Sequence, residues 1–238
     1  MSAAAPRVAV ITGASRGIGE ALVAAYREMG YAVVATSRSI APSEDPMIWT
    51  TQGDIALRDT AERVIAEAVE RFGRIDTLVN NAGVFVAKHF TEYSDDDYSH
   101  VSAVNLDGFF YVTRRAIARM EAQRAGHVVT MTTTLVEQAD ANVPSALVSL
   151  TKGGLAAVTK SLAIEYAAAG IRVNAVSPGV IRTPSYPPDS YAQLGALHPI
   201  GRVGEISDIV AAFRYLESAP FVTGEFLHVD GGQSAGHR

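Results

Sequence analysis

The sequence contains no cysteine, and this absence removes several kinds of chemistry at once. Without thiols the chain forms no disulfide bond, no thiolate metal site and no cysteine nucleophile. We therefore predict no metal site. Because chains without cysteine fit a reducing compartment, we also expect the protein to be cytoplasmic.

Long apolar runs and basic patches are missing as well. The stretch MSAAAPRVAVITGASRG has only a short apolar run before glycines interrupt it, so we expect neither a signal peptide nor a membrane span. The net charge is −5, and basic residues are scattered singly apart from Arg114 and Arg115. No basic stripe exists to neutralise a phosphate backbone, so we expect no nucleic-acid partner.

The order of apolar and helical segments predicts the fold class. With 238 residues and 48% apolar content, we expect a single domain over residues 1–238. Stretches of helical period alternate with short apolar runs, which predicts an α/β protein with a doubly wound parallel sheet of about seven strands. The apolar runs are 7–12, 32–37, 76–80, 127–132, 172–177 and 226–230, and the helical stretches are 17–29, 57–72, about 95–124, about 144–169 and 206–217.

One segment, 183–204, is irregular. Its sequence, TPSYPPDSYAQLGALHPIGRVG, is rich in proline and glycine and breaks the regular alternation late in the sheet. Segments of this kind are often active-site lids, so we interpret it as a substrate lid. The alternative is an ordinary surface connection.

A glycine-rich turn follows the first predicted strand. In VAVITGASRGIGEAL, Gly13, Gly17 and Gly19 stand between a strand and a helix. Glycine is needed where the turn is tight and the backbone approaches a pyrophosphate, whose charge the helix N-terminus stabilises. The motif therefore indicates dinucleotide binding.

The spacing of these glycines, with Thr12 before them, resembles the short-chain dehydrogenase/reductase family. Four further motifs in the same order support the resemblance: NNAG at 80–83, VNLDGFF with Asn105, VNAVSPGVIRT, and FVTGEFLHVDGG near the end. The resemblance covers nearly the whole chain. It implies a Rossmann fold and an NAD(P)(H)-dependent oxidoreductase that transfers hydride between nicotinamide and a small carbonyl, alcohol or imine substrate.

The resemblance also implies which residues bind the cofactor. It assigns the adenine to Asp54, the floor of the site to Asn81 and Gly83, and the nicotinamide carboxamide or a phosphate to Thr183. For Asp54 the alternative is a helix cap or turn residue. The full predicted set is Gly13, Ser15, Arg16, Gly17, Ile18, Gly19, Ser37, Arg38, Asp54, Ile55, Asn81, Ala82, Gly83, Lys152, Pro178, Gly179, Ile181 and Thr183.

The end of the second strand favours NADP(H) over NAD(H). NAD-dependent relatives place a carboxylate there, whereas this chain has Ser37 followed by Arg38. A guanidinium clamps a phosphate, and without a carboxylate nothing repels the 2′-phosphate. Arg16 offers a second cation. The alternative is that Arg38 is a solvated surface charge.

The catalytic positions depart from the family pattern, which is Asn, Ser, Tyr and Lys. Asn105 and Lys152 are present, and Thr133 takes the serine position and keeps a hydroxyl. Thr133 stands 19 residues before Lys152, where 17 is usual, so the intervening loop is two residues longer. We predict Asn105, Thr133 and Lys152 as the catalytic residues.

The tyrosine is absent. Four residues before Lys152, on the same helix face, stands Val148, and no tyrosine occurs between 112 and 165. Ser145 and Ser149 lie on the same stripe, but serine is a poor acid, and a structural role is at least as good an interpretation. The remaining candidate proton donors are Glu137, His89, Tyr186, Tyr191 and Lys152 itself through water.

Three functional hypotheses follow. The first is an oxidoreductase in which another acid serves or the substrate needs none, and the second is a catalytically weak NADP(H)-binding or regulatory protein. A non-redox enzyme such as a halohydrin dehalogenase is disfavoured, since those lose the glycine-rich loop that this chain keeps. The apolar, alanine-rich helices at about 95–124 and 144–169 resemble those that relatives pair between subunits, so we expect a homotetramer or homodimer and a small-molecule substrate.

Overall fold

A seven-stranded parallel sheet forms the centre of the molecule in the computed structural model, which describes residues 5–184 and 187–236. Its strand order is β3-β2-β1-β4-β5-β6-β7, which confirms the predicted doubly wound sheet. The strands are β1 Val8–Thr12, β2 Ala32–Ser37, β3 Ile48–Gln52, β4 Thr77–Asn80, β5 Gly126–Met131, β6 Ile171–Pro178 and β7 Phe226–Val229.

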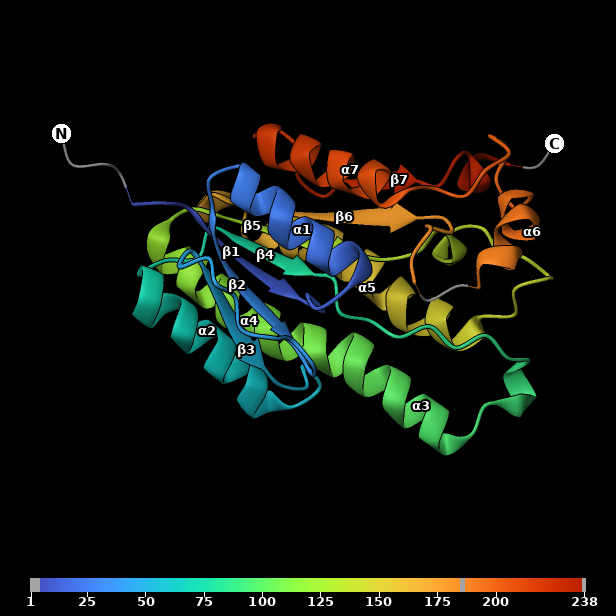
Figure 1. Cartoon of the computed structure of the whole chain (residues 1–238), viewed down its shortest axis with the longest axis horizontal. Coiled ribbons are helices and arrows are strands. Elements are labelled where there is room, and N and C mark those ends of the chain that lie inside the picture. The colour runs from blue at the N-terminus through green and yellow to red at the C-terminus, as the bar shows by residue number, and fades with distance from the viewer. Residues whose placement is uncertain (1–4, 185–186, 237–238) are drawn as a thin grey trace.

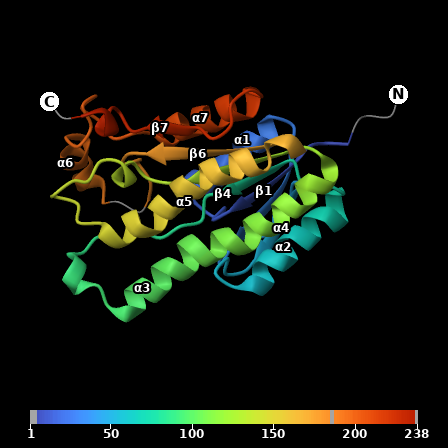
Figure 2. The same ribbon diagram turned by 180° about the vertical axis from the view of Figure 1, so that it is seen from behind.

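Helices cover both faces of this sheet (Figures 1 and 2). On one face α1 and α7 pack together, and on the other α2, α4 and α5 pack on the strands. The helices are α1 Gly17–Glu28, α2 Arg58–Phe72, α3 Asp95–Ser102, α4 Gly108–Gln123, α5 Ala146–Glu165, α6 Tyr191–Gly195 and α7 Ile206–Ser218. Because both faces are covered, the strands β1, β2 and β4 are buried almost throughout.

Two details differ from the sequence analysis. The strand β3 (Ile48–Gln52) was not among the runs singled out, because it is an edge strand, only partly buried and rich in polar side chains. The helical stretch 95–124 is not continuous: a π-helical segment, Ala103–Asp107, separates α3 from α4. Such a wide turn displaces the backbone locally and is frequent at functional sites.

The amino ends of the strands are held together by Glu217 of α7. Its carboxylate accepts hydrogen bonds from the hydroxyls of Tyr26 and Tyr31 at 2.7 and 3.0 Å. Thr77 donates to the same carboxylate, and the ring of His127 lies 3.0 Å from it. This network joins α1, α7, β4 and β5 at one end of the sheet and leaves the opposite end for the site.

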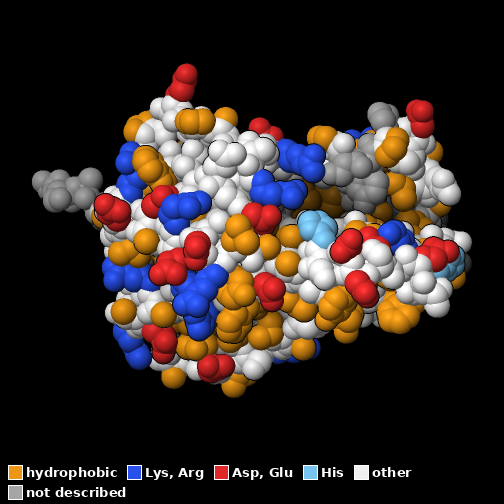
Figure 3. Space-filling view, turned by 90° about the horizontal axis from the view of Figure 1, so that it is seen from below, with side chains coloured by type: hydrophobic (Ala, Val, Ile, Leu, Met, Phe, Trp, Pro, Cys, Tyr) orange, Lys and Arg blue, Asp and Glu red, His pale blue; other side chains and the backbone are white. Residues whose placement is uncertain are grey.

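One helix, α5, is long and apolar enough to cross a membrane by length and composition alone. In the molecule it packs on β6 and α3, and its inner face, including Leu147 and Leu155, is buried. Core helices commonly meet the same criteria. On the face shown in Figure 3, acidic and basic side chains are interspersed rather than gathered into a basic stripe.

Candidate functional site

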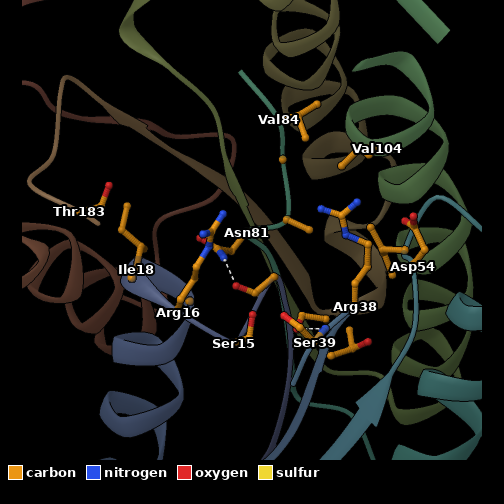
Figure 4. Close-up of a pocket in the computed structure, with 18 of the residues that line it drawn as sticks. Ser15, Arg16, Ile18, Arg38, Ser39, Asp54, Asn81, Val84, Val104 and Thr183 are labelled. Atoms are coloured by element: carbon orange, nitrogen blue, oxygen red, sulfur yellow. Dashed lines mark hydrogen bonds between the residues drawn. The ribbon is translucent and has the colours of Figure 1, made fainter. Parts of the chain in front are cut away.

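Two adjoining cavities lie at the carboxyl ends of the strands. The larger cavity, of about 560 Å³, is bounded by β1, β2, the start of α1 and the loop after β4. Figure 4 shows its walls. It is lined by Gly13, Ser15, Arg16, Gly17, Ile18, Gly19, Thr36, Ser37, Arg38, Ser39, Asp54, Ile55, Asn81, Ala82, Gly83, Val84, Val104, Thr183 and Pro184.

Eighteen residues are predicted to bind the cofactor, and all but four of them line this larger cavity. Pro178, Gly179 and Lys152 line the smaller cavity instead. Ile181 lines neither, because its side chain is buried in the apolar core against α7 and β6.

The glycine-rich turn has a shape that only glycine permits. Gly13 and Gly17 have φ values of +67° and +58°, in the left-handed region. A Cβ at Gly19 would lie 2.1 Å from the carbonyl oxygen of Gly13. The helix α1 begins at Gly17 with no side-chain cap, so its first amides have no side-chain acceptor. A helix start of this kind, open to a cavity, suits the pyrophosphate of a dinucleotide.

Thr12 and Asn81 lock this turn to the loop after β4. The Thr12 hydroxyl accepts hydrogen bonds from the amides of Asn81 and Ala82 at 3.1 and 3.0 Å. In return, the Asn81 amide group donates to the carbonyls of Thr12 and Gly13 at 3.0 and 3.1 Å. The Asn81 side chain therefore holds the wall of the larger cavity in place.

Arg16 and Arg38 are the cations of the larger cavity. Figure 4 shows both guanidinium groups extending into it, one from the start of α1 and one from the end of β2. Among the described residues, the Arg38 guanidinium has no recorded acceptor, and Asp54 is the only carboxylate in the wall. Asp54 accepts a hydrogen bond from the amide of Ala56 at 3.0 Å, so it is a turn residue that also faces the cavity.

The smaller cavity, of about 260 Å³, adjoins the larger one through Asn81, Gly83 and Val84. Most of its wall is apolar, and its polar side chains are few. Besides the shared residues, it is lined by Phe85, Met131, Thr132, Thr133, Leu135, Val143, Lys152, Pro178, Gly179, Val180, Leu194, Leu197 and Gln233.

Among the described residues that line the smaller cavity, Lys152 has the only charged side chain. Its Nζ donates hydrogen bonds to the carbonyl oxygens of Met131 and Thr132, at 3.0 and 3.4 Å. Burial lowers the pKa of the Lys152 amine to about 8. A Cβ at Gly83 would lie 3.3 Å from Nζ, so glycine leaves room for the amine there.

Thr133 lies in the same wall as Lys152, although the loop between them is longer than the family pattern. Its backbone is extended, with φ of −162°, and it precedes the 3₁₀ turn Thr134–Val136. The Thr133 hydroxyl accepts a weak hydrogen bond from the amide of Leu135 at 3.4 Å. The structure therefore brings two of the three predicted catalytic residues to one cavity.

Asn105 is placed differently, behind the wall in the π-helical segment. It is 2% exposed and lines neither of the two cavities. Its amide group donates to the Val84 carbonyl at 3.1 Å and to Thr151 at 3.2 Å, and its oxygen accepts from the Val84 amide at 2.9 Å. In this arrangement Asn105 positions the loop after β4 against α5.

Val148 and the two serines near it do not reach the smaller cavity. The Val148 side chain is fully buried. Ser145 is buried at the start of α5, and the Ser149 hydroxyl donates to the Leu135 carbonyl at 3.2 Å. The structural interpretation of both serines is therefore the better one.

The other candidate proton donors lie outside the smaller cavity, so far as the chain is described. Glu137 is 2.7 Å from the ring of His228, and His89 is exposed in the loop before the 3₁₀ turn Phe90–Glu92. The Tyr191 hydroxyl donates to the carbonyl of Thr183 at 2.8 Å. Tyr186 lies outside the described residues. No cluster of metal-ligating side chains occurs within the described ranges.

Comparison with known proteins identifies the family. A family model described as Enoyl-(Acyl carrier protein) reductase matches residues 13–234. The chain belongs to the short-chain dehydrogenase/reductase family. It is 35% identical to cis-4-hydroxycyclohexanecarboxylate dehydrogenase of Sinomonas cyclohexanicum, over 97% of this chain and 98% of that protein.

Solved structures of the family share the fold over nearly the whole chain. ElxO with NADP bound has a TM-score of 0.91 at 27% identity, covering 97% of this chain and 100% of that one. The 3-ketoacyl-(acyl-carrier-protein) reductase of Brucella melitensis, complexed with NADH, has a TM-score of 0.88 at 29% identity, covering 96% and 98%. As a short-chain dehydrogenase/reductase, the chain is an oxidoreductase for hydride transfer with a nicotinamide cofactor.

Several wall residues of this short-chain dehydrogenase/reductase were not predicted from the sequence. Leu194 and Leu197 come from the irregular segment 183–204, which predicted a lid without saying which side chains face inward. Phe85 lies two residues after NNAG and Gln233 lies directly after HVDGG, so proximity to those motifs was the available signal.

Burial of the Lys152 ammonium predicts a pH-dependent cost in stability. The pKa of its amine falls from 10.5 to about 8 on folding. Between these values the unfolded chain holds a proton that the folded protein has lost, so the free energy of unfolding rises with pH there, and the cost is fully present below pH 8. Lys152→Met has no ammonium and therefore does not have this cost. The free energy of unfolding of the variant minus that of wild type should therefore be about 3 kcal/mol smaller at pH 10.5 than at pH 7.

Urea denaturation at both pH values measures this difference. Lys160→Met, which removes an exposed lysine from the same helix, is the matched control. If the difference in free energy of unfolding between Lys152→Met and wild type does not change with pH, the pKa of Lys152 is not lowered by folding.

Proposed function

We propose that the protein is an NADP(H)-dependent oxidoreductase acting on a small, uncharged, largely apolar carbonyl, alcohol or imine. The preference for NADP(H) is supported by Arg16 and Arg38, which both line the larger cavity, and by the absence of a carboxylate at the end of β2. A 2′-phosphate gains charge-assisted hydrogen bonds from guanidinium groups and meets no repulsion there. Solved structures of relatives contain NADP or NADH, so family membership does not decide between the two cofactors. We therefore base the preference for NADP(H) on the residues of this chain.

The predicted cofactor residues support this proposal by their positions. The amides at the start of α1 would hold the pyrophosphate, Asp54 and Ile55 the adenine, and Thr183 the nicotinamide end. When bound, the cofactor would supply or accept hydride at the junction with the smaller cavity. Lys152 lies at that junction, near Gly83, and would contact the ribose or the substrate.

The smaller cavity supports the choice of substrate. Apart from Lys152, its wall contains no described charged side chain that would recognise a charged substrate, and its volume of about 260 Å³ suits a small molecule. Leu194 and Leu197 reach it from residues 183–204, which we propose as the substrate lid of a single domain spanning 1–238. A cytoplasmic location stays a prediction.

The second candidate is a catalytically weak NADP(H)-binding or regulatory protein. Val148 favours it, because general acid catalysis contributes about 10²- to 10⁴-fold and the usual phenol is absent. The presence of Thr133 and Lys152 in an apolar cavity beside the larger one favours turnover.

A substrate panel separates the two candidates. We expect NADPH oxidation, followed at the nicotinamide absorbance, with at least one uncharged aldehyde, ketone, imine or enone, and little with carboxylated or phosphorylated analogues of the same size. NADPH binding without oxidation by any member of the panel would favour the binding protein.

The cofactor preference is tested at Arg38. Removal of its guanidinium in Arg38→Ala should weaken NADPH binding by about 1.5–3 kcal/mol, the range for hydrogen bonds to charged groups, and leave NADH binding nearly unchanged. Arg58→Ala, which removes an exposed arginine outside the cavity walls, is the control. If isothermal titration shows equal losses of binding free energy for NADPH and NADH, Arg38 does not bind the 2′-phosphate.

We also propose a homotetramer or homodimer. Large apolar side chains on the outer faces of α4 and α5 support it: Phe110, Leu150 and Ile164 are 54%, 63% and 81% exposed. Sedimentation equilibrium at micromolar concentration should give two or four times the chain mass of 25.2 kDa. Leu150→Glu should lower the assembly state, and a wild-type mass of one chain would reject the proposal.

A further inference from the structure

The smaller cavity raises the question of which group protonates the substrate. Every side chain of its described wall other than Lys152 is apolar, a hydroxyl or an amide. Hydroxyls and amides do not release a proton near neutral pH. Of the candidates Glu137, His89, Tyr191 and Lys152, only Lys152 lies in this wall.

The hydrogen bonds of Lys152 leave one proton available. An ammonium has three N–H donors. Two of them are used by the carbonyls of Met131 and Thr132, and within the described part of the chain no third acceptor is recorded. A neutral amine still has two N–H donors, so both hydrogen bonds survive loss of the third proton. The side chain is thus held in one place in either protonation state.

The surroundings make the loss of that proton easy. The elements packed against α5 near Lys152 are α3, the π-helical segment, β6 and the turn Thr134–Val136. None of the charged or titratable groups on or beside these elements shifts the pKa of Lys152, which burial alone lowers to about 8. These groups are Asp95, Asp96, Asp97, Tyr98, His100, Asp107, Glu137 and Arg172. An amine with this pKa is mostly charged at pH 7 and still a competent acid.

We propose that Lys152 is the proton donor of this enzyme, giving its proton directly to the substrate oxygen in place of the missing tyrosine. The inference rests on the proposed function. During reduction the carbonyl carbon gains a hydride, and the electron pair of the carbon–oxygen π bond moves to the oxygen. That oxygen takes a proton from the Lys152 ammonium, and the resulting neutral amine is reprotonated by water. In the oxidation direction each transfer is reversed.

The neighbourhood of Lys152 suits this step. Loss of the proton leaves a neutral amine in an apolar cavity, which removes the buried charge. Thr133 lies in the same wall and offers a hydroxyl that can orient the same oxygen. Val148 contributes no polar atom that competes for it.

The first test measures the amine without cofactor or substrate. The chain has only three lysines, Lys88, Lys152 and Lys160, so ¹³C labelling at lysine Cε gives three signals, and Lys152→Arg assigns one of them. We expect the Lys152 signal to titrate with a midpoint near pH 8. A midpoint above pH 10 would overturn the inference, since the amine would then resemble a solvated lysine.

The second test separates proton donation from charge. Arginine keeps a positive charge but does not release a proton at these pH values. In Lys152→Arg the turnover number for reduction should fall by about 10²- to 10⁴-fold, far more than NADPH affinity changes. Lys152→Gln should lose turnover equally. In wild type, turnover in reduction should decline as pH rises above about 8, where the ammonium is lost.

The experiments distinguish the role of Lys152 as proton donor from the proposed function of the protein. If the turnover number of Lys152→Arg is within tenfold of wild type, Lys152 is not the proton donor, although the proposed function still holds. The same conclusion follows if Tyr186→Phe loses turnover by the 10²- to 10⁴-fold expected for the variants of Lys152. Absence of NADPH binding to the wild-type protein would overturn the proposed function and, with it, the inference.

Discussion

One ammonium group, partly buried in a cavity wall and without a described carboxylate partner, is the constraint around which this site is built. Lys152 lies in the second turn of α5, and its only described partners are two backbone carbonyls at the end of β5. Partial burial of a charge without a carboxylate partner costs folding free energy. The packing around Lys152 therefore has to fix the amine and exclude acidic groups.

The parallel sheet makes this possible. Carboxyl ends of parallel strands meet at one edge, so the glycine turn after β1, the loop after β4 and the end of β5 converge there. Thr12 and Asn81 bind the first two together, and Asn105 binds the loop after β4 to α5. The amine thus stands beside both cavities because three polar side chains hold the backbone around it, while the Glu217 network closes the opposite end.

Much of this arrangement could be predicted from the sequence, because it rests on local patterns. The glycines at 13, 17 and 19 have steric requirements that no other residue meets, and fourteen predicted residues line the larger cavity. The strand β3 escaped prediction because IWTTQ is a half-buried edge with little periodicity. The interruption of the long helix at Ala103–Asp107 depends on tertiary contacts of Asn105, which no local pattern encodes.

The chemistry of the smaller cavity was only partly predictable. The sequence predicts Val148 at the position where the family pattern has tyrosine, but it does not say which remaining side chains share a wall. That depends on how the loop 134–144 folds, and the two additional residues there left the place of Thr133 open. In the structure Thr133 and Lys152 line one cavity, whereas Glu137 turns outward to His228. Loop conformation decides between these cases, and it follows from packing rather than from spacing.

A crystal structure of the protein with NADP⁺ and an apolar ketone would show whether Lys152 is placed to protonate the substrate. The two ligands form a complex that cannot react, so the ketone oxygen reports where the proton would be delivered. If Lys152 delivers the proton, this oxygen will lie within about 3.2 Å of Lys152 Nζ, at hydrogen-bonding distance. A ketone oxygen more than about 4 Å from Nζ, or one held by another acid such as Tyr186, would contradict it.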